Sequence, residues 1–308
     1  MASLILAGKI MSLLLILFVG FLIVRLGILS SDDARVVSRL TIYAVTPCTI
    51  ITSYQVSFTP DIRDALLVTL AAGVITQMFF TFISLFYTKL LKLDEVEHAA
   101  IVYSNSLNLI VPLVSALLGP QWVIYASMYS SFQTFMMWSN GKSILCGERR
   151  PDFRKVFKNI NIISVFIGIF IMILGITEFP GPIQSAMNSL GSLVGAMGML
   201  NMGMIIGGME LREIFTYKRT PLMCFMRLIV MPIPAVLFLK FGPMAAMATD
   251  GKQLMLIVLL AACGPTAVNI TQMAQLYGRD AKYASAIGVV STLLCIITMP
   301  LMIALYNL

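Results

Sequence analysis

The 308-residue chain is 59% hydrophobic and only 11% charged, with a mean hydropathy of +0.92. Because soluble domains average about 25% charged residues, this composition excludes an ordinary soluble protein and predicts an all-α polytopic membrane protein. The net charge of +7 does not indicate nucleic acid binding, since the basic residues sit at the ends of apolar runs and not along one face.

Ten apolar runs are long enough to cross a hydrocarbon core of about 30 Å, which takes about 20 residues. We expect ten transmembrane helices, at residues 4–27, 36–55, 65–88, 98–118, 122–141, 160–177, 183–209, 221–239, 253–277 and 283–306. The first run lacks the basic start and the small-residue cleavage pattern of a signal peptide, so we expect it to remain in the mature protein.

Basic residues are distributed unequally between the two sides of the predicted bundle. Most of the 21 lysines and arginines fall on the side that the chain reaches after its first span, including the run from Arg149 to Lys158. Cytoplasmic loops carry such an excess of basic residues. The sequence therefore predicts a multi-pass protein of the plasma (inner) membrane, surrounded by membrane lipids, with both termini on the extracytoplasmic side.

The basic loop divides the chain into two sets of five spans. Because five is odd, a duplicated half must insert with opposite topology. The triplet YAS occurs at Tyr125 and again at Tyr283, and an offset of 158 residues aligns the polar stretch of the fourth span with that of the ninth. We expect two inverted five-helix repeats, at residues 1–147 and 160–308, joined by a cytoplasmic basic linker at 148–159.

The fourth and ninth spans each contain polar residues and a proline within an apolar run. Asn105 and Ser106 precede Pro112 in the fourth span, and Pro265 precedes Thr266 in the ninth. Proline removes a hydrogen-bond donor from a helix, and interrupted helices are tolerated within a membrane only where they face protein or a water-filled cavity. A simple proline kink is the alternative, but two such stretches at matching positions favour broken helices that cross at a substrate site.

The candidate substrate-binding residues are the polar and proline residues of these two stretches and a midspan glutamine of the fifth span: Asn105, Ser106, Asn108, Pro112, Pro265, Thr266, Asn269, Thr271, Gln272 and Gln133. Their neutral donors and acceptors, with the partial positive charge of half-helix amino termini, suit a carboxylate. They also suit a polar neutral solute. For Gln133, and for Gln77 in the third span, hydrogen bonding between helices is the alternative interpretation.

Ionisable residues are missing from the middle of the predicted spans. Proton or sodium coupling usually relies on such residues, so their absence favours uniport or exchange, although sodium can also bind carbonyl and hydroxyl oxygens. Arg227 lies about two turns into the eighth span from its cytoplasmic end. We expect its side chain to snorkel to the membrane interface, with attraction of substrate at the inner mouth as the alternative.

Motifs for catalysis and for metal or cofactor binding are not found in the sequence. There is no HExxH, GxSxG, Walker A or GxGxxG motif, no CxxC pair among the five cysteines, and His98 is the single histidine. The sequence therefore predicts neither an enzyme nor a bound metal or cofactor. A membrane receptor or an intramembrane enzyme is the alternative from another class of function.

Several stretches resemble the auxin efflux carrier family of membrane transporters. VGFLIVRLGILSSDDARVVSRLTIYAVTPC, from Val19, looks like the first two spans of the family, and MIIGGMEL, from Met204, resembles the end of its seventh span. Asn105 and Pro112 match its fourth-span pattern of an asparagine seven residues before a proline, and GPTAVNITQMAQLYG, from Gly264, matches its ninth span. The short central loop is similar to that of bacterial members.

The resemblance implies a ten-span inverted repeat with crossing broken helices. It also implies a scaffold of spans 1, 2, 6 and 7 that forms a homodimer, and a transport bundle of spans 3–5 and 8–10 that moves in an elevator fashion. By position, Asn105, Pro112, Pro265 and Asn269 would lie at the crossover where the substrate carboxylate binds. We therefore expect a uniporter or facilitator of small organic anions, such as carboxylates or auxin-like acids. A sodium- or proton-coupled symporter that resembles bile-acid carriers is the alternative.

Overall fold

The computed structural model describes residues 2–57, 59–110, 113–114, 118–119, 122–147, 160–208 and 217–308. Within these ranges every named element is a helix. Five helical segments are long and apolar enough to cross a membrane, at Ser31–Ser53, Pro60–Leu91, Gly181–Gly207, Thr220–Ala246 and Ala281–Asn307. Shorter apolar helices occur at Leu14–Arg25, Ile163–Ile173 and Gly251–Ala262. The chain is therefore an all-helical, multi-pass membrane protein.

In the first half of the chain the helical elements are α1 (Ala2–Arg25), η1 (Ser31–Asp33), α2 (Ala34–Leu40), η2 (Thr41–Val45), α3 (Thr46–Ser53), α4 (Pro60–Leu91), α5 (Glu95–Val102), η3 (Ser106–Ile110), α7 (Val123–Met136), η5 (Met137–Gly141) and α8 (Lys142–Cys146). Here η1 is a 3-10 helix, and η2, η3 and η5 are π-helical segments. The predicted fourth span is divided, because α5 ends at Val102 and the next helical segment begins at Ser106.

In the second half the elements are α10 (Ile160–Ile173), α11 (Gly181–Ser192), α12 (Val194–Gly207), α14 (Thr220–Phe225), η6 (Met226–Val230), α15 (Pro232–Phe241), η7 (Pro243–Ala246), α16 (Gly251–Ala262), α17 (Val268–Leu276) and α18 (Ala281–Asn307). The predicted ninth span is divided between α16 and α17. The π-helical segments η2 and η6 each end two residues before a proline, Pro47 and Pro232, which cannot donate the regular helical hydrogen bond.

Local sequence explains where α4 and α5 begin. Helix α4 starts at Pro60, whose missing N–H costs nothing in the first turn, and the Thr59 hydroxyl accepts from the N–H of Ile62 at 3.3 Å. Asp94 and Glu97 form a capping box at the start of α5. The Asp94 carboxylate accepts from the Glu97 N–H at 2.8 Å, and the Glu97 carboxylate accepts from the Asp94 N–H at 3.1 Å. The half-helix that leads into the interrupted fourth span is thus fixed at its start.

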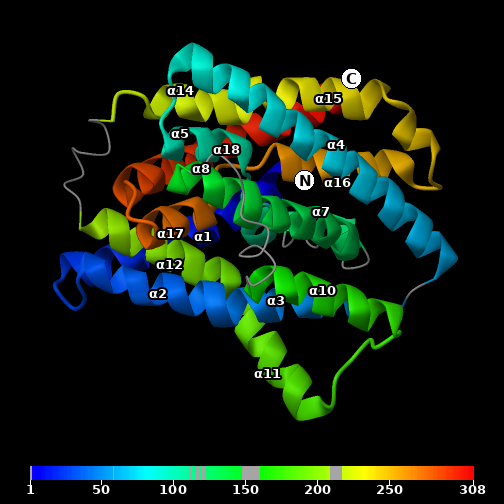
Figure 1. Ribbon diagram of the computed structural model, residues 1–308, viewed down its shortest axis with the longest axis horizontal. Coiled ribbons are helices and arrows are strands. Elements are labelled where there is room, and N and C mark those ends of the chain that lie inside the picture. The colour runs from blue at the N-terminus through cyan, green and yellow to red at the C-terminus, as the bar shows by residue number, and fades with distance from the viewer. Residues whose placement is uncertain are drawn as a thin grey trace.

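Two groups of helices pack side by side (Figure 1). In the first group, α1 packs against α12, and α3 packs against α10 and α11, with α2, α3, α10 and α11 along the lower side of the figure. In the second group, α4 packs against α7 and α16, and α18 packs against α14, α15 and α17. We call the second group, which also contains α5 and α8, the crossover bundle. It comprises the helices of the predicted spans 3–5 and 8–10.

Helices α1 and α12 approach each other at glycines. A Cβ atom on Gly203 would lie 1.9 Å from the carbonyl oxygen of Leu17, and one on Gly20 would lie 2.3 Å from the carbonyl oxygen of Leu200. Gly203 and Gly207 are four residues apart, so they lie on one face of α12. Small residues at this spacing let two membrane helices touch backbone to backbone.

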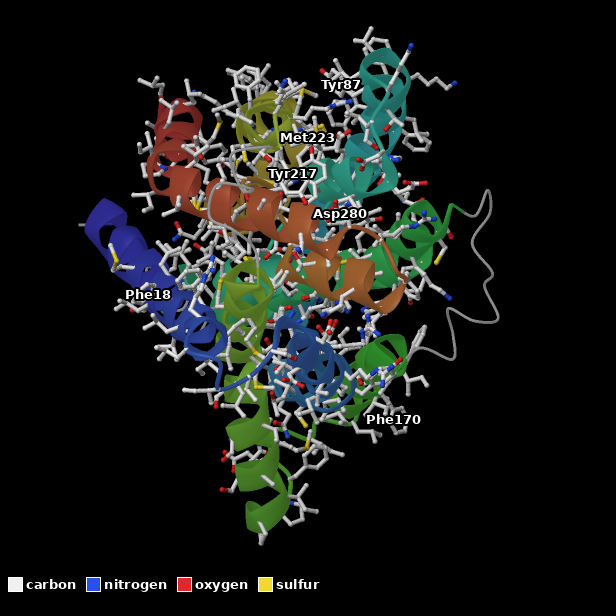
Figure 2. All side chains as sticks on the ribbon, turned by 90° about the vertical axis from the view of Figure 1, so that its left-hand side faces the viewer. Phe18, Tyr87, Phe170, Tyr217, Met223 and Asp280 are labelled. Carbon is white, nitrogen blue, oxygen red and sulfur yellow. The ribbon has the colours of Figure 1, made fainter. Side chains whose placement is uncertain are left out.

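Large apolar side chains are exposed on the outside of both helix groups. Phe18 on α1 and Phe170 on α10 point away from the molecule (Figure 2) and are 50% and 61% exposed, and Phe82 and Phe86 on α4 are 63% and 60% exposed. Exposed apolar surface of this extent is unfavourable in water, whereas lipid hydrocarbon accommodates it. The side-chain distribution therefore agrees with a protein embedded in a bilayer.

Candidate functional site

The interrupted stretches of the fourth and ninth spans meet and pair through their backbones. The N–H of Asn105 donates to the carbonyl oxygen of Pro265 at 2.8 Å, and the N–H of Ala267 donates to the carbonyl oxygen of Tyr103 at 3.0 Å. Unpaired backbone groups are costly within a membrane, and here each broken helix satisfies groups freed by the other. Both predicted interruptions are present, and they lie together. We call this meeting point the crossover.

The crossover also sets the spacing between the two stretches. Ser104 lies opposite Thr266, so the paired residues are 162 positions apart. An antiparallel pair shows which residues are neighbours and not which are equivalent in two repeats, so the alignment through the YAS triplets stays a prediction.

Side chains of neighbouring spans bind the remaining backbone groups of this pair. In the orientation that satisfies its neighbours, the amide of Gln133 accepts from the N–H of Ser104 at 3.0 Å and donates to the carbonyl oxygen of Ser104 at 3.1 Å. It also bonds the hydroxyl of Ser106. The N–H of Thr266 donates to the hydroxyl of Ser291 at 3.2 Å. Gln133 therefore lies at the crossover and supports the backbone of the fourth span. Ser291, which the sequence analysis did not identify, supports the backbone of the ninth span.

Arg227 is fully buried and binds the carboxyl ends of both half-helices that lead into the crossover. Its guanidinium donates to the carbonyl oxygens of Ile101 and Val102 at 3.1 and 3.3 Å, at the end of α5. It also donates to the carbonyl oxygens of Ala262 and Gly264 at 2.7 and 3.0 Å, at the end of α16. The last carbonyl groups of a helix lack partners within the helix and carry partial negative charge. One arginine therefore caps two helix ends.

The prediction that Arg227 snorkels to the interface is wrong, because its side chain has 0% exposure. The position of Arg227 along the eighth span indicated how deep the residue lies in the membrane. It did not reveal that the broken helices place carbonyl oxygens at the same depth. Four carbonyl oxygens and the face of the Phe80 ring, whose centroid lies 5.7 Å from the guanidinium carbon, surround the charge. These partners retain the guanidinium inside the protein.

The amino end of α17 lies directly after the crossover. The helix begins at Val268, and its N-cap residue, Ala267, has no side chain that accepts from the first N–H groups. Helix amino ends carry partial positive charge and bind anions. Because Arg227 compensates the carboxyl ends of α5 and α16, the positive end of α17 is left to attract negative charge.

Two predicted site residues, Asn105 and Asn269, lie on the two stretches that meet at the crossover. Asn105 belongs to the paired stretch and is 2% exposed, and its side-chain nitrogen has no hydrogen-bond partner among the described residues. Asn269 lies in the first turn of α17 and is 9% exposed. A buried polar group without a partner costs about 1–3 kcal/mol, so a ligand oxygen at this position would be stabilising.

The other predicted residues have different surroundings. The hydroxyl of Thr266 donates to a carbonyl oxygen of α5 at 3.1 Å, so it supports the crossover. Thr271 and Gln272, on α17, are buried, and their side-chain polar atoms have no partners within the described part of the chain. The side chain of Asn108 and all of Pro112 lie outside the described residues.

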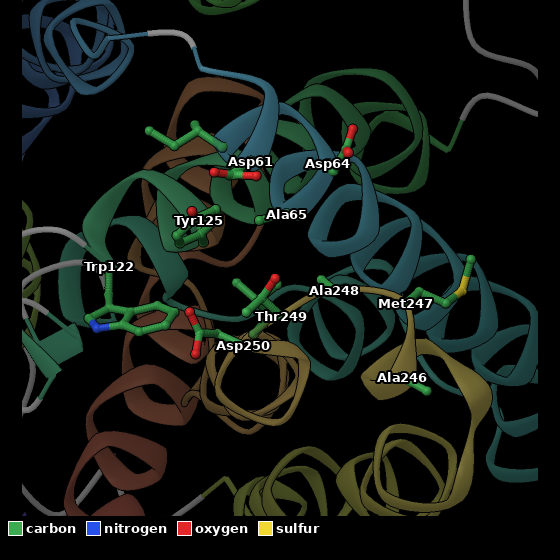
Figure 3. A pocket seen from close by; sticks show the side chains of 12 residues that line it. Asp61, Asp64, Ala65, Trp122, Tyr125, Ala246, Met247, Ala248, Thr249 and Asp250 are labelled. Atoms are coloured by element: carbon green, nitrogen blue, oxygen red, sulfur yellow. The ribbon is translucent and has the colours of Figure 1, made fainter.

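Two cavities lie at opposite ends of the crossover bundle. One, of about 430 Å³, lies at the start of α4 and is lined by Asp61, Asp64, Trp122, Tyr125 and Asp250 among others (Figure 3). The other, of about 470 Å³, lies where α4 ends and α5 begins. The described lining residues of both cavities exclude the crossover residues named above. The crossover is therefore buried between two openings.

Comparison with known proteins identifies the family. A family model described as "Membrane transport protein" matches residues 5–151 and 149–303, which together span nearly the whole chain. A search among curated proteins found no match. The matched family is that of the auxin efflux carriers, which confirms the resemblance seen in the sequence motifs. The chain therefore belongs to the auxin efflux carrier family of membrane transport proteins.

Proposed function

We propose that this protein is a secondary transporter that carries small organic anions, such as carboxylates or auxin-like acids, by uniport. Membership of the family establishes membrane transport. The observation that carries the choice of an anion is the binding of Arg227 to the carboxyl ends of both α5 and α16. Because those negative ends are compensated, a substrate at the crossover meets donors and positive charge.

A carboxylate at the crossover would accept hydrogen bonds from neutral donors. The side-chain nitrogen of Asn105, the amide of Asn269 and the first N–H groups of α17 are the donors that we assign to this role. Hydrogen bonds to a charged acceptor are stronger than those to a neutral one, which favours a carboxylate over a neutral solute. Ser106, Thr271 and Gln272 would shape the remainder of the pocket.

For the mechanism we propose alternating access, in which the crossover opens in turn to the two cavities at the ends of the crossover bundle. The proposal includes the ten-span inverted repeat, a homodimeric scaffold of spans 1, 2, 6 and 7, and elevator motion of the crossover bundle. It is supported by the two cavities on either side of the buried crossover.

Coupled symport is the second candidate, and two buried ionisable residues of α5 favour it. Glu97 is 1% exposed and accepts from the Tyr283 hydroxyl at 2.7 Å, and His98 is 7% exposed and lies 2.9 Å from the Ser84 hydroxyl. Both lie in the first turn of α5, away from the crossover. Their contacts within the protein account for their burial, so we prefer uniport.

We expect Asn105→Ala and Asn269→Ala each to weaken binding of a transported carboxylate by about 10- to 100-fold, the effect of losing one hydrogen bond to a charged group. The folded protein should survive, because the side-chain nitrogen of Asn105 makes no hydrogen bond that the protein would lose. Substrate-induced thermal stabilisation in detergent, titrated across lactate, benzoate and indole-3-acetate, measures the affinity.

Asn188→Ala is the matched control, since Asn188 lies on the exposed face of α11. It should bind as the unmodified protein does. Unchanged affinity in both crossover variants would remove Asn105 and Asn269 from the binding site.

We also expect anion flux into liposomes to respond to membrane potential and to be indifferent to imposed sodium or proton gradients. The expectation follows from uniport of a charged solute, in which one charge crosses the membrane in each cycle. Radiolabelled carboxylate uptake, with potassium and valinomycin setting the potential, provides the measurement. Strict dependence on either ion gradient would favour the coupled symporter instead.

A further inference from the structure

Arg227 differs from the other buried charged side chain of the crossover bundle. Glu97, which is 1% exposed, has a counter-charge in Arg219, whose Nε lies 2.9 Å from its carboxylate. Within the described part of the chain, Arg227 contacts carbonyl oxygens and the Phe80 ring but forms no ion pair. The interior of the bundle therefore holds one full positive charge that no acidic side chain among the described residues cancels.

The carbonyl groups compensate Arg227 locally but do not remove its charge from the bundle as a whole. Each helix carries about −0.5 of a charge at its carboxyl end and about +0.5 at its amino end, so its dipole adds no net charge. Within the crossover, Arg227 offsets the partial negative charges at the carboxyl ends of α5 and α16, and the partial positive charge at the amino end of α17 is left without an offset there. A monovalent anion bound there balances the positive charge.

We propose that Arg227 is the fixed counter-charge of the transported anion, so that the interior of the crossover bundle is electrically neutral when a monovalent anion is bound and carries one positive charge when the site is empty. The inference rests on the proposed function and identifies the step of the transport cycle that moves charge across the membrane. Arg227 travels with the site because its guanidinium is bonded to both α5 and α16. The return of the empty bundle is then the step that membrane potential drives.

This assignment predicts a direction. A potential of about 100 mV acting on one full charge shifts an equilibrium by about 50-fold. With the cytoplasm negative, the potential draws the empty bundle toward the cytoplasmic side, so the empty binding site faces the cytoplasm. The loaded bundle, whose interior is then neutral, moves independently of the potential. The cycle therefore favours export of monovalent anions.

The test separates exchange from net flux in liposomes that contain the full-length protein. The probe is whichever of lactate, benzoate or indole-3-acetate gives the largest flux, measured at pH 8, where a histidine of ordinary pKa is neutral. With the same anion at saturating concentration on both sides, only loaded bundles cross, so the exchange rate should change by less than about twofold between 0 and 100 mV. Net flux into anion-free medium should instead be potential-dependent.

Two substitutions sharpen the test. Arg227→Gln removes the charge, so the loaded bundle becomes negative and exchange should vary by about sevenfold over 100 mV, the square root of the equilibrium factor. Arg227→Lys keeps the charge and should retain potential-independent exchange even if transport is slower. If Arg227→Gln does not fold, potential-dependent exchange in the unmodified protein still overturns the assignment.

Exchange by the unmodified protein that varies several-fold with potential would overturn the assignment of Arg227 while leaving anion transport intact. An absence of flux and of thermal stabilisation for every anion tested would overturn the proposed function and this inference with it. Potential-independent exchange in the unmodified protein, lost in Arg227→Gln and retained in Arg227→Lys, would establish it.

Discussion

Replacing Arg227 with methionine should destabilise the protein by about 3–5 kcal/mol, since several buried hydrogen-bond acceptors lose their donor at once. Methionine fills a similar volume but donates no hydrogen bond, so the four carbonyl oxygens at the ends of α5 and α16 would be left without the guanidinium. Each unsatisfied buried acceptor costs about 1–3 kcal/mol, and local rearrangement recovers part of that loss. Thermal unfolding of the purified protein in detergent measures the effect.

A second arginine provides the control for this substitution. Arg63 bonds the carboxylate of Asp64 at 2.9 Å, with both side chains more than half exposed. Exposed ion pairs contribute little to stability, so Arg63→Met should melt at the same temperature as the unmodified protein. Arg227→Lys should fall between the two, since an ammonium group keeps the charge but cannot reach both helix ends with a planar fork. Equal melting temperatures for Arg227→Met and Arg63→Met would contradict the capping role.

Gly203→Leu should force α1 and α12 apart and lower stability by about 3 kcal/mol, at the upper end of the cost of overpacking. The clash is with backbone, because a Cβ on Gly203 would lie 1.9 Å from the carbonyl oxygen of Leu17, and a rigid helix cannot move aside as a flexible side chain can. The measurement is the fraction of protein that remains monodisperse by size-exclusion chromatography after heating.

Gly8→Leu is the matched substitution on the same pair of helices. Gly8 lies in α1, and an added Cβ there meets no atom within 4 Å. Replacing a helical glycine with leucine at an open position should leave stability unchanged or raise it slightly. If Gly203→Leu and Gly8→Leu behave alike, the close contact between α1 and α12 does not contribute to stability.

The sequence was sufficient to predict the broken helices, because proline and clustered amides are unfavourable inside an apolar helix unless the helix opens. The backbone pairing of Asn105 with Pro265 agrees with that reasoning. The residues that pair at the crossover were not predictable, since a repeat alignment relates equivalent positions and not the neighbours in an antiparallel pair.

The role of Arg227 could not be read from the sequence. Hydropathy gives the depth of a residue in a span, but the partners of a buried charge come from elsewhere in the fold, here from carbonyl groups more than thirty residues away along the chain. The same limit applies to Gln133. The sequence suggested that it bonds another helix, but not which groups it bonds. It bonds the backbone of Ser104 in the fourth span, which is a support for the site. An arginine in the interior of an apolar span therefore indicates that hydrogen-bond acceptors lie buried at the same depth in the fold.

The carboxyl groups around the cavity at the start of α4 have a kinetic consequence. Asp61, Asp64 and Asp250 line this cavity, which lies at the end of the crossover bundle predicted to face outside, and Arg63 offsets one of the three charges. A negative rim slows the arrival of anions from that side and hastens their departure, and salt screens its field over about 10 Å at 0.1 M. An anion carrier with such a rim loads more quickly from the cytoplasm than from outside, and the difference narrows as ionic strength rises.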